Sequence, residues 1–167
     1  MASFSQEEFV KIINEANDSG DLISSDHFES FSDSVEQRLS SLINWKTKVV
    51  VVVCPSAEKC LNTMALLKKL GCHSKIGKLF SRHMKVEQQA EFLKSYKPRI
   101  SVGTPNRITK LIQGGLFADL DILAFDTSLD AKARNVLQIR ETRIDVLNLL
   151  RLQKDRLEKN KTRIVLF

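Results

Sequence analysis

The sequence predicts an α/β fold in which a parallel sheet of about five strands has helices on both faces. Short apolar runs alternate along the chain with longer segments of helical periodicity, which is the order expected when helices join parallel strands. The run Val49–Val53 consists of valine alone. A strand without a polar face is expected where helical layers cover both sides of a sheet.

The expected elements follow this alternation. Strands are predicted at residues 49–53, 74–80, 100–103, 120–125 and 163–167, and helices at 57–70, 86–95, 105–113 and over most of 131–160. Ser56 is a suitable N-cap for the first of these helices. Residues 1–45 are predicted to form two further helices with a polar break at 17–21, and Ser32 or Asp33 is expected to cap the second.

Charge divides the chain into two parts. Residues 1–45 carry two basic and nine acidic side chains, whereas residues 46–167 carry 24 basic and 11 acidic ones. The prediction is therefore an acidic helical leader followed by a basic α/β domain. A basic domain favours an anionic partner, most commonly RNA or DNA. The alternative is that the acidic leader folds back over the basic domain.

Several classes of protein are not expected. The longest wholly apolar run spans Val49 to Cys54, too short to cross a bilayer, and the first residues do not have the pattern of a secretory signal. The three cysteines (Cys54, Cys60 and Cys72) form no CxxC pair. We expect reduced thiols in a reducing compartment, either cytosol or nucleus.

The stretch Ile100–Arg107 reads as a strand that ends at Gly103 and turns directly into a helix. Thr104 is expected to cap this helix through its hydroxyl, and Pro105 suits the first helical position. Arg107, expected to be exposed, adds a positive charge beside the free amides of the first turn, a combination that suits a phosphate. The same residues also fit a well-capped turn with a solvated arginine.

In this order the elements resemble the first RecA-like domain of a DEAD-box RNA helicase over roughly residues 48–167. Thr104–Arg107 is similar to the family's Thr-Pro-Gly-Arg motif, an RNA-backbone contact. Pro55–Cys60 stands where the family has Pro-Thr-Arg-Glu-Leu-Ala, and Asp126–Leu129 stands at the position of the Asp-Glu-Ala-Asp box. The resemblance implies a degenerate DEAD-box-like RecA domain at residues 46–167.

The departures from the helicase pattern bear on catalysis. The sequence contains no GxxxxGK[ST] phosphate loop, and Thr127 stands where the helicases have the glutamate that positions the attacking water. The residues given hold no second RecA-like domain to close over ATP. We therefore expect no nucleotide, cofactor or metal, no catalytic residues and no ATPase activity. Asp126 is expected to be a hydrogen-bonding turn residue rather than a metal ligand.

With the segment Lys78–Gln89 between its two retained motifs, the chain is similar to the Cms family of eukaryotic pre-ribosomal 90S complex subunits. This resemblance implies a non-catalytic assembly factor of the small-subunit processome in the nucleus and nucleolus. Its implied partners are pre-rRNA or small nucleolar RNA and other processome proteins, without a membrane.

The predicted RNA surface collects the turns at the carboxyl ends of the strands, because these ends share one edge of a parallel sheet. Its residues are Ser56, Arg82, His83, Lys85, Thr104, Pro105, Asn106 and Arg107. The alternative function is a protein–protein adaptor that docks on other ribosome-biogenesis factors without direct RNA binding.

Overall fold

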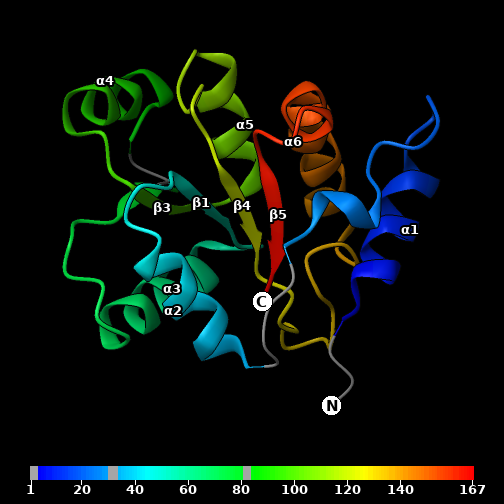
Figure 1. Ribbon diagram of the computed structural model, residues 1–167, viewed down its shortest axis with the longest axis horizontal. Coiled ribbons are helices and arrows are strands. Elements are labelled where there is room, and N and C mark those ends of the chain that lie inside the picture. Colours follow the sequence, from blue (N-terminus) through cyan, green and yellow to red (C-terminus); the bar gives the residue numbers. More distant parts are fainter. Residues whose placement is uncertain (1–3, 30–33, 81–83) are drawn as a thin grey trace.

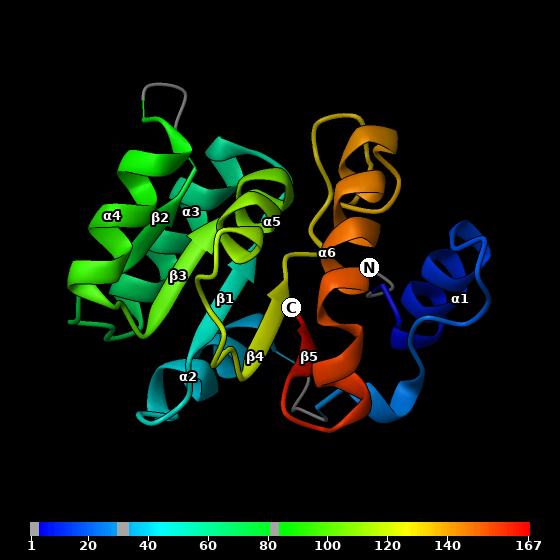
Figure 2. The ribbon, with the colours of Figure 1, turned by 90° about the horizontal axis from the view of Figure 1, so that it is seen from above.

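The computed structural model describes residues 4–29, 34–80 and 84–167 and shows one parallel sheet of five strands in the order β2-β3-β1-β4-β5. In Figure 2 the arrows of the sheet run in the same direction. The strands are β1 (Val50–Val53), β2 (Gly77–Leu79), β3 (Ile100–Gly103), β4 (Ile122–Phe125) and β5 (Arg163–Leu166). The α/β, RecA-like prediction is confirmed.

Helices cover both faces of the sheet (Figure 1). They are α1 (Gln6–Ala16), the short 3₁₀ helix η1 (Ser25–His27), α2 (Val35–Asn44), α3 (Ala57–Lys69), α4 (Val86–Tyr96), α5 (Pro105–Gln113) and α6 (Arg140–Glu158). Val50 and Val52 pack with α2 and α3, whereas Val51 and Val53 pack with α1, α4, α5 and α6. All four valines are fully buried, so the expected strand without a wet face is confirmed.

Some element boundaries differ from the prediction. The segment predicted as the start of a long last helix forms turns instead, and α6 begins only at Arg140. The Asp130 carboxylate accepts from the backbone amides of Lys132 and Arg134, both at 2.9 Å. Side chains of this kind compete with a helix by bonding the local backbone. The Asn135 side chain does the same for Leu137 at 3.0 Å.

The other two differences are smaller. β2 is shorter than the predicted strand 74–80. The N-cap of α2 is Ser34, whose hydroxyl accepts from the Gln37 amide at 3.1 Å. The predicted caps Ser32 and Asp33 lie outside the described residues.

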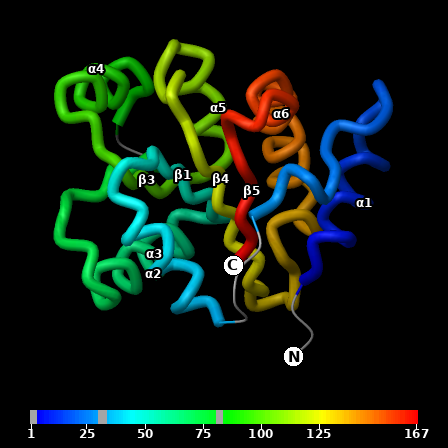
Figure 3. Tube along the Cα trace, in the orientation of Figure 1, coloured from blue at the N-terminus to red at the C-terminus, as the bar shows by residue number. Residues whose placement is uncertain are grey.

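The segment around Phe28, between α1 and α2, lies beside β5. Phe28 forms a parallel bridge with Ile164, and the tube in Figure 3 shows the segment leading to Phe28 beside β5. Arg163 donates to the Glu29 carboxylate at 2.9 Å and to the Phe28 carbonyl at 2.7 Å. Phe9 of α1 is fully buried in the same core as the sheet. The acidic leader therefore packs directly on the basic part of the chain.

Candidate nucleic-acid interface

The register of the sheet brings the ends of the strands together along one edge, here called the carboxyl edge. Gly103 of β3 lies beside Leu79 on one side and Val53 on the other. Val53 in turn lies beside Phe125, which pairs with Leu166. The turn after β1, which holds Ser56, and the turn after β3, which holds Thr104, are therefore neighbours.

Glycine is required at position 103 because a larger residue has no room there. A side chain there would overlap Leu79 of the neighbouring strand. The backbones of β2 and β3 thus approach closely just before the turn that carries Thr104–Arg107.

Ser56 caps α3 as predicted. Its hydroxyl accepts from the Lys59 amide at 3.2 Å, and the residue is exposed. The Lys59 ammonium donates to the Ser128 hydroxyl at 2.9 Å and to the Leu129 carbonyl at 3.0 Å, which links α3 to the loop after β4. Sequence reasoning did not include Lys59, whose role depends on a residue nearly seventy positions away in the chain.

Thr104 occupies the N-cap position of α5, and Pro105 is its buried first residue. The predicted hydroxyl cap is wrong, because the Thr104 side chain makes no capping hydrogen bond. Proline has no N–H, so this helix begins with one fewer amide to satisfy. The Asn106 amide lies on the outside and donates to Asp145 of α6 at 3.4 Å.

Arg107 is half-buried, so the expectation of an exposed, solvated arginine is wrong. Its guanidinium donates to the Met84 carbonyl and to the Gln89 side-chain carbonyl, both at 2.9 Å. Gln89 is only 2% exposed and also donates its amide to the Lys78 carbonyl. Arg107 therefore joins α5 to α4, and through Gln89 to strand β2.

Gln89 is a second residue of this site that sequence reasoning missed. A signal was present, because Gln89 occupies a helical position between Val86 and Leu93 that an apolar residue would ordinarily fill. A polar residue on the buried face of a helix indicates a partner, since a buried amide without one is costly. The identity of that partner depended on the three-dimensional structure.

Lys85 is exposed and immediately precedes α4, where its amide donates to the Gln88 side chain at 3.3 Å. Because Arg107 binds the carbonyl of the preceding Met84, Lys85 lies near the turn after β3. Arg82 and His83, the other predicted residues of this loop, lie outside the described residues.

The turn at the position of the Asp-Glu-Ala-Asp box is held by hydrogen bonds. Asp126 is 5% exposed, and its carboxylate accepts from the Ser128 amide at 2.9 Å, so the prediction of a turn residue is confirmed. The amide and the hydroxyl of Thr127 both donate to the Phe167 carbonyl at 2.8 Å. Among the described residues, no group of three His, Cys, Asp or Glu side chains could hold a metal ion.

The three cysteines are free and buried. A hydrogen bond with Cys54 and burial raise the pKa of the Cys60 thiol far above its usual range, and the neighbouring Asp126 adds to the effect. Cys60 therefore remains a protonated thiol at neutral pH. It packs in the core between β1 and α3.

The five-stranded parallel sheet, covered by helices on both faces and with its connecting turns along the carboxyl edge, defines a RecA-like α/β domain. The chain belongs to the CMS1 family, described as the U3-containing 90S pre-ribosomal complex subunit, whose model matches residues 22–167. The predicted resemblance to the Cms family is thereby confirmed. None of the helices in the described part of the chain is long and apolar enough to span a membrane.

Relatives in animals and fungi support this assignment. The human protein CMSS1 is 34% identical over 110 residues, which cover 64% of this chain and 39% of the human protein. The Xenopus laevis protein CMSS1 is 35% identical over 63% of this chain and 39% of its own length. The Chaetomium thermophilum protein CMS1 is 39% identical over 46% of this chain and 32% of its own length. The match thus spans about two fifths of the length of the animal relatives.

Proposed function

We propose that this chain is a non-catalytic assembly factor of the small-subunit processome, the 90S pre-ribosome, and contacts RNA through its carboxyl edge. Membership of a family described as a U3-containing 90S pre-ribosomal complex subunit supports this role. The partners proposed are pre-rRNA or small nucleolar RNA and other processome proteins. The corresponding compartment is the nucleus, and within it the nucleolus.

The main observation in support of an RNA contact is that the carboxyl ends of β1 and β3 lie next to each other. This arrangement brings the turns that lead into α3 and α5 to the same edge of the sheet, with the exposed Ser56 in the first turn and the exposed Lys85 near the second. Helix amino termini present amides and a partial positive charge, and lysine adds a full charge. Such groups recognise phosphate and sugar, so binding is expected to depend weakly on RNA sequence.

Two features support the proposal that this chain has no catalytic activity. Residue 127 is a threonine whose hydroxyl is already bonded to the Phe167 carbonyl, so it offers no carboxylate to position a water. The sequence also has no phosphate loop, which in related enzymes cradles the phosphates of ATP.

The second candidate is a protein–protein adaptor without direct RNA binding. The contacts of Arg107 favour the adaptor. Arg107 is the arginine of the motif that resembles an RNA-backbone contact, and part of its guanidinium is already bound to Met84 and Gln89. In this case the Thr104–Arg107 turn stabilises the domain, and the role in the 90S complex comes from protein contacts alone.

Lys85→Glu is the sharpest test, because Lys85 is exposed and the structure records no side-chain partner for it among the described residues. Binding to an unstructured RNA would be measured by fluorescence anisotropy across a salt series. The variant is expected to bind RNA less tightly and to reduce the salt slope by about 0.7, the value for one phosphate contact on a single strand. Lys11→Glu, in the leader helix α1, changes the charge equally and is the matched control.

The two candidates predict different outcomes. RNA binding that falls for Lys85→Glu and not for Lys11→Glu supports the carboxyl edge as an RNA surface. Equal losses for both variants would indicate that only net charge matters. Absence of RNA binding by the wild-type chain at low salt would favour the adaptor.

A further inference from the structure

A pocket with a volume of about 560 Å³ opens at the opposite edge of the sheet, where β1, β3 and β4 begin. Three segments line it: residues shortly before β1, the end of α4 with the approach to β3, and the loop 115–119 between α5 and β4. We call it the amino-edge pocket. Its volume lies within the range of small-ligand and peptide sites.

The amino-edge pocket has an apolar floor and a basic rim. Val49, Leu93 and Phe117 form the floor, and all three belong to the core on the α5 side of the sheet or pack against it. Lys46, Lys94 and Lys97 stand on the rim and are exposed. Asp119 is the one acidic residue among the described residues that line the pocket.

The fourth cation, Arg99, fixes a wall of the pocket. Its guanidinium donates to the carbonyls of Ile43 and Trp45, both at 2.8 Å, and to that of Leu42 at 3.1 Å. A cation bound to carbonyls at the end of a helix is favourably placed. The segment between α2 and β1 is therefore held in place before any ligand arrives.

Two residues of the pocket have a backbone conformation that ordinarily favours glycine. Lys97 has a φ angle of 47° and Phe117 one of 58°. Glycine would adopt both conformations without strain, whereas lysine and phenylalanine adopt them at a cost. Both residues border the amino-edge pocket, and the same conformation occurs outside it at Ala133 and Asn160.

The apolar floor favours a protein ligand over RNA. Both α4 and α5 end at the amino-edge pocket, and the last carbonyls of α5 already accept from the backbone amides of Gly114, Gly115 and Leu116. The groups left for a ligand are therefore the exposed lysines and the apolar floor. A peptide supplies carboxylates for the lysines and an apolar side chain for the floor, whereas the phosphates of RNA match the lysines alone.

We propose that the amino-edge pocket binds a short segment of a partner protein in which an apolar side chain is flanked by acidic residues. The charge of the rim argues for the acidic flanks, and the floor argues for the apolar anchor. The site is independent of the carboxyl edge. The domain then has one edge for RNA and the opposite edge for a protein, which suits a subunit of a large assembly.

The test is a selection of short random peptides displayed on phage against the full chain, followed by affinity measurements with the selected peptides. We expect enrichment of peptides with Leu, Phe or Trp between Asp and Glu. The double variant Lys46→Glu/Lys94→Glu should weaken their binding about tenfold, because two attractions become repulsions. Phe117→Asn should weaken it about fivefold, since asparagine tolerates the left-handed backbone but removes the apolar floor.

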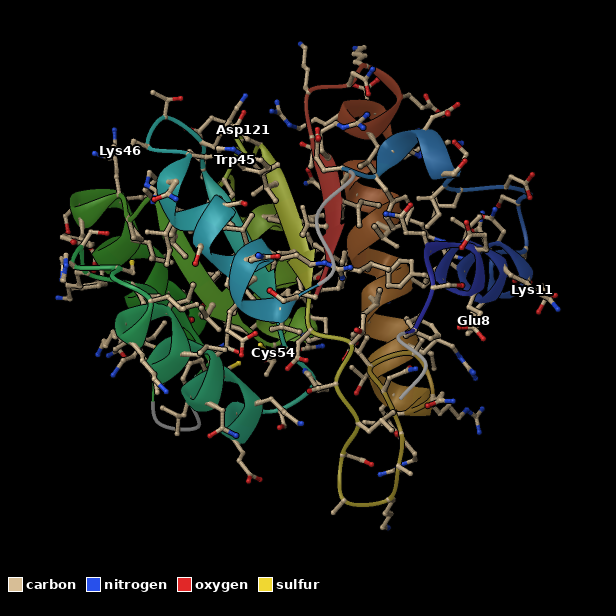
Figure 4. The ribbon with its side chains drawn as sticks, turned by 60° about the horizontal axis from the view of Figure 1, so that its bottom comes forward. Glu8, Lys11, Trp45, Lys46, Cys54 and Asp121 are labelled. Carbon is tan, nitrogen blue, oxygen red and sulfur yellow. The ribbon has the colours of Figure 1, made fainter. Side chains whose placement is uncertain are left out.

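The matched control is Lys11→Glu/Lys132→Glu, which changes the net charge equally. Figure 4 shows Lys11 on the far side of the molecule from Lys46, and Lys132 follows β4 at the carboxyl edge. The control should bind the selected peptides as the wild type does. Failure to enrich any acidic peptide, or equal affinity of both double variants, would overturn the proposal. So would saturation of the pocket by RNA or by a second copy of the chain.

Discussion

Phe9→Ala tests whether the acidic leader is part of the folded core or an attachment to it. Phe9 lies in α1 and is fully buried. Its ring centroid is 5.1 Å from that of Phe125 in β4 and 5.8 Å from that of Phe28. One residue of the leader therefore contacts both the central part of the sheet and the segment beside β5.

The expected loss follows from this burial. Truncating a buried phenylalanine to alanine costs about 3–5 kcal/mol, a large share of the stability of an ordinary domain. For a chain of this length, each kcal/mol lowers Tm by about 2–4 °C. We therefore expect Tm to fall by about 6–20 °C in a thermal melt followed by circular dichroism. A urea titration would give the free energy of unfolding independently.

Phe92→Ala is the matched control. It removes the same atoms from a residue that is 43% exposed on α4, where it stacks on Tyr96 beneath Lys75. Its cost should be about 1 kcal/mol or less. Equal losses for the two variants, or a separate early transition for Phe9→Ala, would refute the view that leader and sheet form one cooperative core.

Two further predictions address the carboxyl edge. Gln89→Leu should lower the free energy of unfolding by about 2 kcal/mol, because it leaves the Lys78 carbonyl and the Arg107 guanidinium each without a partner that they have in the wild type; a urea midpoint unchanged from the wild type would contradict the stabilising role of the Arg107–Gln89 contact. The chain should not bind ATP, since it has neither a phosphate loop nor a glutamate at residue 127; a stoichiometric, micromolar heat in isothermal titration with ATP and Mg²⁺ would contradict this.

Much of the fold was predictable because each strand carries its own signal. Val49–Val53 has no polar face, so it could only be a strand covered on both sides. The region 131–139 was not predictable by the same means. Its apolar residues fit a helix, yet Asp130 and Asn135 bond the local backbone and hold it in turns. Periodicity does not register that competition.

The candidate site was also predictable only in part. The positions of Ser56 and Thr104 follow from the order of strands and helices, which local patterns determine. The partners of Arg107 do not, because Met84 and Gln89 are about twenty residues earlier and reach it only after α4 packs beside α5. An arginine is expected to be solvated when only its sequence is known, and that expectation fails here because the buried Gln89 side chain accepts a hydrogen bond from the guanidinium.

The hydrogen bonds of Arg107 to Met84 and Gln89 change which residues support RNA binding. A turn that resembles an RNA-contacting motif would ordinarily direct attention to its arginine, but Arg107 has a structural role that is sufficient to explain its presence. Loss of RNA affinity in an Arg107 variant could therefore arise from a displaced α4 as readily as from a lost phosphate contact. Lys85 does not carry this ambiguity, since it is exposed beside the same turn. RNA binding is consequently expected to depend on Lys85 and on the turns that lead into α3 and α5 at the carboxyl edge, rather than on the Arg107 guanidinium.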